Sequence, residues 1–258
     1  MPRRNRRSYV AKPPRTWRRR YVYKYGRVEN DDQLRWLEEI ILQNHVYFPR
    51  PAELNDPREA RPKFVRASLE DYKQMLFRGY IAAHRQLTPE EKADHFGVIS
   101  FNLDRFGLDW VIKEGERLLH AQLANQRIYS LSKRPNNPYL WEEYAADHRG
   151  YCLEFRRTDI FSVVAEVRYR NRVEFNATAE IVNAAFYFYK RRKWSKEEEL
   201  RIVGQRSPIG YLQFDSKVLP RIFVGRNMTE QNRTTIQEWA LKRKPVLVVE
   251  SAASLVMS

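Results

Sequence analysis

The hydrophobic and polar positions of the chain alternate in many short runs, which predicts a protein built largely from short strands. Residues 21–25, Tyr-Val-Tyr-Lys-Tyr, alternate and are rich in aromatic and β-branched side chains, as is typical of a strand. Further strands are predicted at 46–48, 97–101, 128–132, 151–155, 163–169, 173–175, 200–203, 211–214, 221–224 and 246–249.

Other segments repeat their apolar residues every three or four positions, which predicts helices between these strands. Asn30 or Asp31 is expected to cap a helix that ends near His45, and Thr229 one that ends near Lys242. Further helices are predicted at 68–86, 88–96, 104–126, 139–146 and 178–192. We therefore expect one α+β domain, with a mixed, largely antiparallel sheet, helices packed around it and a mainly helical insertion at about 60–126.

The most informative stretch is 128–155. A strand at 128–132 is followed by the turn Pro135-Asn136-Asn137-Pro138 and by a short helix with Leu140, Trp141 and Tyr144 at helical spacing. Gly150 then restarts the chain as a strand. This compact succession of strand, loop, helix and strand predicts the centre of the domain.

Positive charge is concentrated at the N-terminus. The net charge is +15, and the first 20 residues hold nine cations and no acid. A segment this charged buries too little apolar surface to order itself, so we expect 1–20 to be a disordered basic tail and the domain to span 21–258. The tail is expected to contact phosphates of nucleic acid, and the alternative is a solvated tail with weak affinity for polyanions.

Cysteine content and hydropathy indicate the cellular compartment in which we expect the protein. Cys152 is the only cysteine of the 258 residues, so an intramolecular disulfide is excluded. No apolar run reaches the length of a membrane span, and no apolar segment follows the basic N-terminus as in a signal peptide. We expect a soluble, cytoplasmic protein without a membrane partner, while the sequence leaves its oligomeric state open.

Several motifs in a fixed order resemble one protein family. They are Tyr23-Lys24-Tyr25, Asn55-Asp56-Pro57, the Ser-x-Ser to His-x-Gly-x-Cys run of 130–152, Lys190, Trp194-x-x-Glu197-x-Glu199-x-Arg201 and Val224-Gly225. Together they resemble the bacterial and phage proteins grouped as domain of unknown function 2971. The chain departs from that family at Gly26, where the family has Arg, and at Arg58-Glu59, where it has Phe-Asp. The resemblance implies a fold neighbourhood and no settled activity.

The candidate chemistry centres on two acids. Glu197 and Glu199 are two residues apart at the entrance of a predicted strand, so both side chains are expected on one face. Ser130 and Ser132 share a face in the same way. Arg27, Ser-x-Ser and Glu-x-Glu, in this order, resemble the arginine-serine-glutamate class of ADP-ribosyltransferases.

That second resemblance implies NAD as cofactor, no metal, and a toxin or defence effector whose acceptor is a protein or a nucleic acid. Glu199 would stabilise the oxocarbenium-like transition state and Glu197 would orient the acceptor. Ser130 and Ser132 would order the site, and Arg27 or Lys24 would hold the phosphates. The remaining candidates to line the cofactor cleft are Tyr25, Trp141, Tyr144 and His148. The alternatives are a core role for Trp141 and a loop cap with a satisfied hydrogen bond for His148.

Three other interpretations remain open. A nuclease would gather Asp56, Glu197 and Glu199 around Mg²⁺, with Lys190 or Lys193 nearby. A binding module without enzymatic activity would use the tail and exposed aromatic rings to stack on bases. Finally, the acidic strand could be a surface hairpin whose charge pairs contribute little.

Overall fold

The fold is organised around one seven-stranded sheet, seen in a computed structural model that describes residues 15–54, 63–65, 68–83, 86–124, 126–171, 174–176, 185–204 and 210–255. Across the sheet the strands run in the order β13 (Val248–Ser251), β12 (Arg221–Val224), β5 (Tyr151–Arg156), β1 (Tyr21–Gly26), β4 (Arg127–Ser132), β10 (Glu199–Gly204) and β6 (Ala165–Glu166). All neighbours are antiparallel except β12 and β13. The predicted α+β class with a mixed, largely antiparallel sheet is confirmed.

The described residues also form three short strand pairs, five α-helices, and several 3-10 or π-helical turns. The pairs are β2 (His45–Tyr47) with β11 (Tyr211–Gln213), β3 (Lys63–Val65) with β8 (Glu174–Asn176), and β7 (Arg168–Arg170) with β9 (Tyr189–Arg191). The helices are α1 (Asp31–Glu38), α2 (Leu69–Ala83), α3 (Pro89–Ala124), α4 (Pro138–Glu143) and α6 (Glu230–Lys242). Asn30 and Thr229 cap α1 and α6 with their side chains, as predicted.

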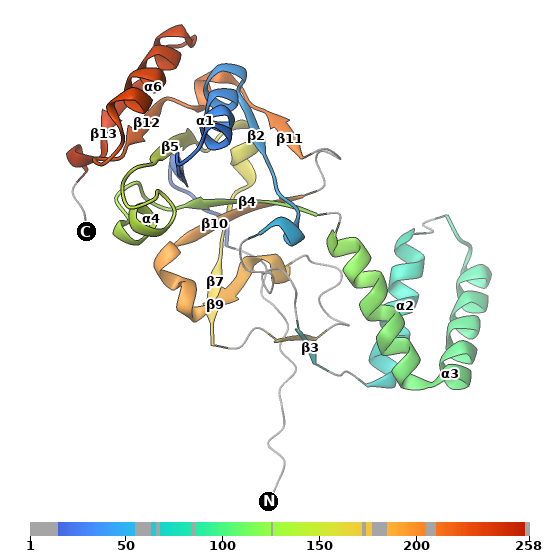
Figure 1. Ribbon diagram of the computed structural model, residues 1–258. Helices are drawn as coiled ribbons and strands as arrows, with labels where there is room; N and C mark the ends of the chain where they lie inside the picture. Colours follow the sequence, from blue (N-terminus) through green and yellow to red (C-terminus); the bar gives the residue numbers. More distant parts are fainter. Residues whose placement is uncertain are drawn as a thin grey trace, which may run out of the picture.

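Different helices cover the two faces of the sheet. Successive residues of a strand point to opposite faces, so the neighbours Cys152 and Leu153 of β5 belong to different cores. On one face Leu37 of α1 and Ile236 of α6 join the main core with Val22 and Leu153. On the other, Trp141 of α4 packs with Cys152. Figure 1 shows α1 and α6 on one side of the sheet and α4 on the other.

The helical insertion stands to one side of the sheet (Figure 1). The predicted strand at 97–101 is wrong, because these residues lie within α3. Ile99 and Leu103, one helical turn apart, pack on Tyr72 of α2, and this contact favours the helix. α3 is kinked at Gly107, whose φ of 77° suits glycine. No helix in the described ranges is long and apolar enough to cross a membrane.

The predicted helix at 178–192 is also wrong over its described part. Residues 185–188 form a 3-10 turn, and the chain continues as β9, which pairs in parallel with β7. Residues 177–184 lie outside the described ranges. Pairing of Tyr189 and Lys190 with Arg168 and Tyr169 overrides the local periodicity, since tertiary contacts outweigh propensity.

The packed chain begins before Tyr21, so the predicted boundary of the tail needs correction. Trp17 is buried in the main core and its backbone N–H donates to the carbonyl of Val164. Thr16 forms a bridge to Ala165 on the edge strand β6. Residues 1–14 lie outside the described ranges. An indole side chain buries much apolar area, which is enough to order this segment. The sequence prediction followed the charge of the surrounding arginines and gave no weight to Trp17.

We expect Trp17→Ala to lower the free energy of unfolding by about 3 kcal/mol, because it leaves a cavity at the edge of the core. Removing residues 1–14 is expected to change it by less than about 0.5 kcal/mol. Trp36→Ala is the matched control, since Trp36 is 52% exposed. Urea denaturation measures all three. Equal losses in the two tryptophan variants would contradict this packing.

Candidate active site

The site begins where the central sheet opens between β1 and β4. β1 pairs with β5 over six residue pairs, and β4 pairs with β10 over six, but β1 and β4 share only the pair Tyr23↔Ser132. Beyond that pair, the Lys24 Nζ donates across the gap to the carbonyl oxygen of Ser130, at 3.0 Å. The gap leaves strand edges available to form the wall of a pocket.

A pocket of about 580 Å³ lies at this opening. Its walls come from β1 and the residues after it, from β4, and from the acidic segment around β10. They include residues 23–27, residues 130–132, Lys190, Glu197 and Glu199. The structure therefore brings together the Lys24, Arg27, Ser-x-Ser and Glu-x-Glu positions that the sequence singled out.

The two acids reach the pocket by a route that the sequence did not predict. Only Glu199 lies on β10; Glu197 is the last residue of the 3-10 helix η5 (Arg192–Glu197). Glu198, between them, has φ 48° and ψ 46°, a left-handed conformation that costs on the order of 1–3 kcal/mol in residues other than glycine. Its side chain pairs with Arg134, at 2.7 Å. This turn directs Glu197 and Glu199 into the same pocket.

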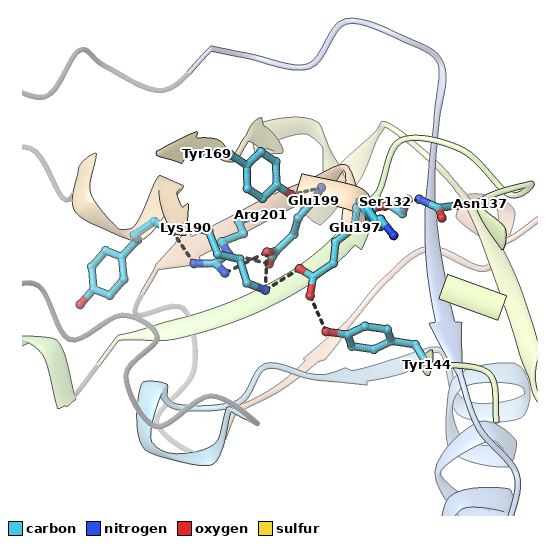
Figure 2. Close-up of polar contacts among 10 residues, drawn as sticks. Ser132, Asn137, Tyr144, Tyr169, Lys190, Glu197, Glu199 and Arg201 are labelled. Atoms are coloured by element: carbon cyan, nitrogen blue, oxygen red, sulfur yellow. Dashed lines mark hydrogen bonds and ion pairs between the residues drawn. The ribbon is translucent and has the colours of Figure 1, made fainter. Parts of the chain in front are cut away.

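Both acids are buried and neutralised by two cations (Figure 2). Arg201 holds Glu199 with two hydrogen bonds, Nε to Oε1 at 2.6 Å and Nη2 to Oε2 at 2.9 Å. Lys190 lies between the acids, with its Nζ 3.1 Å from Oε2 of Glu199 and 2.5 Å from Oε2 of Glu197. Two buried positive charges thus balance two buried negative ones.

The two carboxylates differ in how many hydrogen bonds they can still accept from a ligand. A carboxylate accepts about four hydrogen bonds. Glu199 receives three, from Arg201 and Lys190. Glu197 receives two within the described chain, from Lys190 and from the hydroxyl of Tyr144 at 2.6 Å. Glu197 therefore keeps more acceptor capacity toward the pocket than Glu199 does.

Burial and the neighbouring charges together shift the pKa values of this cluster. It raises the pKa of Glu199, with the charge of Glu197 adding to the rise and that of Lys190 opposing it. Burial alone would lower the pKa of Lys190, but the two carboxylates outweigh it and the pKa lies above its usual value. Burial also raises the pKa of Tyr144, together with Glu197. At neutral pH, Lys190 is thus a cation and Tyr144 a hydrogen-bond donor.

Lys24 is the other buried cation of the pocket. Burial lowers its pKa to about 8, and the carboxylate of Glu199 acts in the opposite direction. Its ammonium group also lies 4.8 Å from the ring centroid of Tyr129, where a cation interacts favourably with the ring face. Lys24 therefore changes charge close to neutral pH, inside the pocket.

The rim of the pocket is more exposed. Arg27 donates to the carbonyl oxygen of Glu143 at 2.8 Å and pairs with Glu29 at 3.2 Å. Trp36 of α1 also lines the pocket, with an exposed fraction of 52%. A large exposed aromatic ring beside a polar pocket is suited to stacking on a planar ligand. The sequence pattern of α1 did not mark Trp36 as a site residue.

Ser132 and Tyr25 line the pocket but have structural partners. The Ser132 hydroxyl donates to the carbonyl of Glu197 at 3.4 Å, so it supports the acidic turn. The Tyr25 hydroxyl donates to the carbonyl of Arg134 at 2.9 Å and accepts from the backbone N–H of Asn137. Asn137 in turn donates to the carbonyl of Lys196, at 2.7 Å. These bonds fix the loop before α4 against η5.

Trp141 and His148 do not line the pocket. Trp141 is fully buried, and its indole N–H donates to the carbonyl of Pro135 at 2.8 Å. The His148 ring stacks on it, with centroids 5.5 Å apart and planes within 2°. The packing alternative holds for Trp141. His148 also packs, but its buried Nδ1 has no hydrogen-bond partner within the described chain, so the satisfied hydrogen bond expected of a loop cap is not seen there.

The sequence reasoning missed two residues that hold Glu199. Arg201 follows it by two positions on β10, so the rule that placed the two acids on one face applies equally to this pair. Tyr169 of β7 accepts the backbone N–H of Glu199 through its hydroxyl at 2.7 Å. No local signal identified Tyr169, because β7 approaches β10 only in the folded chain.

The nuclease interpretation gains little support from this geometry. Asp56 lies outside the described ranges. The carboxylates of Glu197 and Glu199 are already neutralised by Lys190 and Arg201, so they offer a divalent cation little net charge. In the part of the chain that the structure describes, no three His, Cys, Asp or Glu side chains lie so that they could hold a metal ion.

Comparison with known proteins identifies no relative of this chain. No protein-family model, curated protein or solved structure matches the chain.

Proposed function

We propose that this pocket binds a nicotinamide dinucleotide and transfers its ADP-ribosyl group to an acceptor. The observation that carries the proposal is the opening between β1 and β4, which gathers Lys24, the Ser-x-Ser strand and Glu197 around one pocket. Its volume of about 580 Å³ lies within the usual range for sites of small molecules and cofactors, roughly 300–1,000 Å³.

The charges of the pocket suit the two ends of such a ligand. A dinucleotide carries a negative diphosphate, which Lys24 and Arg27 can bind through charge-assisted hydrogen bonds. The nicotinamide ring carries a positive charge, and its neutral ribose carries hydroxyls that the remaining acceptor positions of Glu197 can bind. The exposed ring of Trp36 offers a stacking surface for a base.

The proposed step breaks the bond between C1 of the ribose and the nicotinamide nitrogen, whose electron pair leaves with neutral nicotinamide. Positive charge develops on the ribose, and a fixed carboxylate close to it lowers the barrier. The acceptor's nitrogen or oxygen then forms the new bond to C1 and gives its proton to a carboxylate. When bound, the dinucleotide supplies the activated glycosidic bond, and the protein supplies position and charge.

The acceptor capacity of the carboxylates supports a different division of roles from the one predicted. Glu197 accepts two hydrogen bonds and can still accept a ribose hydroxyl, whereas Glu199 already accepts three, from Arg201 and Lys190. We therefore assign the contact with the reacting ribose to Glu197. Glu199 then acts as a positioning residue, since it holds Lys190 against Glu197. A cytoplasmic site of action fits the buried free thiol of Cys152.

The affinity for NAD is expected to fall as the pH rises from 7 to 9, because Lys24 loses its charge near pH 8. Lys24→Met should weaken binding about tenfold at pH 7 and remove this pH dependence. Isothermal titration calorimetry of the full chain measures both effects. Lys217→Met, which removes an exposed lysine, is the matched control. An affinity for NAD that does not change with pH, or an equal loss of affinity in the two variants, would argue against a diphosphate at Lys24.

A further inference from the structure

A strip of exposed cations runs beside the pocket. Residues 190–196 read Lys-Arg-Arg-Lys-Trp-Ser-Lys. Lys190 is turned inward to the acids, whereas four others are exposed: Arg191, Arg192, Lys193 and Lys196. We name these four exposed side chains the basic ridge.

The charges of the basic ridge are not balanced by neighbouring acids. Among the residues that the structure describes, none of the four pairs with a carboxylate. Lys193 lies 4.6 Å from the ring centroid of Trp194, and Lys196 lies 6.0 Å from that of Tyr139. Unpaired cations interleaved with aromatic rings are typical of surfaces that follow a nucleic-acid backbone.

The basic ridge is continuous with the pocket wall. It occupies β9 and η5, between Lys190 and Glu197, and both of these residues line the pocket. The hydrogen bond from Asn137 to the carbonyl of Lys196 fixes the end of the ridge against the loop before α4. A polymer bound along the ridge would therefore pass the mouth of the pocket at Glu197.

The basic N-terminal stretch joins the fold at the same side of the sheet. The carbonyl of Arg15 accepts the backbone N–H of Glu166 on β6, and β6 is the neighbour of β10. The first 20 residues carry nine cations. The described part of this stretch, residues 15–20, holds four of these, Arg15, Arg18, Arg19 and Arg20, and so brings further positive charge to the edge of the sheet nearest the acidic turn.

We propose that the basic ridge binds single-stranded nucleic acid and presents one of its nucleotides to the pocket as the acceptor. The binding surface stands independently, while the acceptor role rests on the proposed transferase. A base inside a duplex is stacked and paired, so its atoms could not reach Glu197 within the pocket. Single-stranded bases can turn outward and stack on aromatic side chains.

In the transfer, a nucleophilic nitrogen or oxygen of the presented nucleotide forms a bond to C1 of the ribose as the bond to nicotinamide breaks. The proton of that nucleophile passes to the carboxylate of Glu197. Neutral nicotinamide takes the electron pair of the broken bond. No further oxidant, reductant or metal enters this balance.

The test is fluorescence anisotropy of a labelled single-stranded oligonucleotide with the full chain. Arg191→Gln/Arg192→Gln/Lys193→Gln should lower affinity about 10- to 100-fold near 0.1 M salt. It should also reduce the slope of log affinity against log salt by about 2, because single strands release about 0.7 counterion per phosphate contact. Lys217→Gln/Lys242→Gln/Lys244→Gln removes three exposed lysines elsewhere and should cost far less.

Equal losses in the two triple variants overturn the site, as does tighter binding of duplex or of polyglutamate than of single strand. The ridge variant should also lose transfer of labelled ADP-ribose to the oligonucleotide while keeping its affinity for NAD. Ridge-dependent binding without any transfer supports the surface and overturns the acceptor role. Transfer that is unaffected by the ridge variant overturns the ridge alone and leaves the transferase supported.

Discussion

Arg201→Met is expected to lower the free energy of unfolding by about 3–5 kcal/mol, because it leaves the buried carboxylate of Glu199 without its main partner. The Arg201 side chain is inaccessible to solvent, and it makes two hydrogen bonds to Glu199 and one to the carbonyl of Tyr187. Met fills part of the same volume, so the loss measures chiefly the charge. Urea denaturation at pH 7 provides the value.

The double variant Glu199→Gln/Arg201→Met is the control, since it removes both charges and should recover about half of the loss. The pH dependence gives a second check. Burial already raises the folded pKa of Glu199, and loss of Arg201 raises it further. A raised pKa means that the native state takes up a proton first, so the Arg201→Met variant should gain stability relative to wild type from pH 7 to 5. A loss below about 1 kcal/mol would contradict the buried ion cluster.

Glu197→Gln is expected to lower the rate of ADP-ribosyl transfer by about 1,000-fold or more, because it removes the charge that faces the developing positive ribose. Gln has nearly the shape of Glu, so the contacts with Tyr144 and Lys190 can remain as hydrogen bonds. The affinity for NAD should change much less than the rate. Single-turnover transfer of labelled ADP-ribose separates the two.

Glu198→Gln is the matched control, because Glu198 does not line the pocket and pairs with Arg134, both side chains being half-buried. Its rate should stay within about twofold of wild type, since the substitution keeps the shape of the side chain and changes no residue that lines the pocket. Glu199→Gln should lower both the rate and the stability. If Glu197→Gln keeps more than about a tenth of the wild-type rate, Glu197 is not the carboxylate at the reacting carbon.

Local patterns predicted the strands that position the site. Alternation marked β1, β4 and β10, and the spacing of Ser130 and Ser132 placed both hydroxyls on one face. The antiparallel register then sets Ser132 opposite Glu199 and Ser130 opposite Arg201. Much of the candidate site could therefore be predicted from the sequence, because these residues lie on regular strands.

The remaining features depend on contacts between distant segments. Lys190 lies on β9 rather than on a helix because β9 pairs with β7, and Glu197 faces the pocket because Glu198 adopts a left-handed turn. Trp17 enters the core through a bridge to β6. No periodicity within a short window contains this information. The larger number of hydrogen bonds to Glu199 than to Glu197 likewise depends on the folded chain.

The most direct test of the transferase is to incubate the full chain with NAD labelled in its ADP-ribose part, together with single-stranded nucleic acid or cell extract, with and without a chelator. The account predicts label transfer that survives chelation and disappears in Glu197→Gln. Cleavage of nucleic acid that is abolished by the chelator, with no label transferred, would contradict it and favour a metal-dependent nuclease.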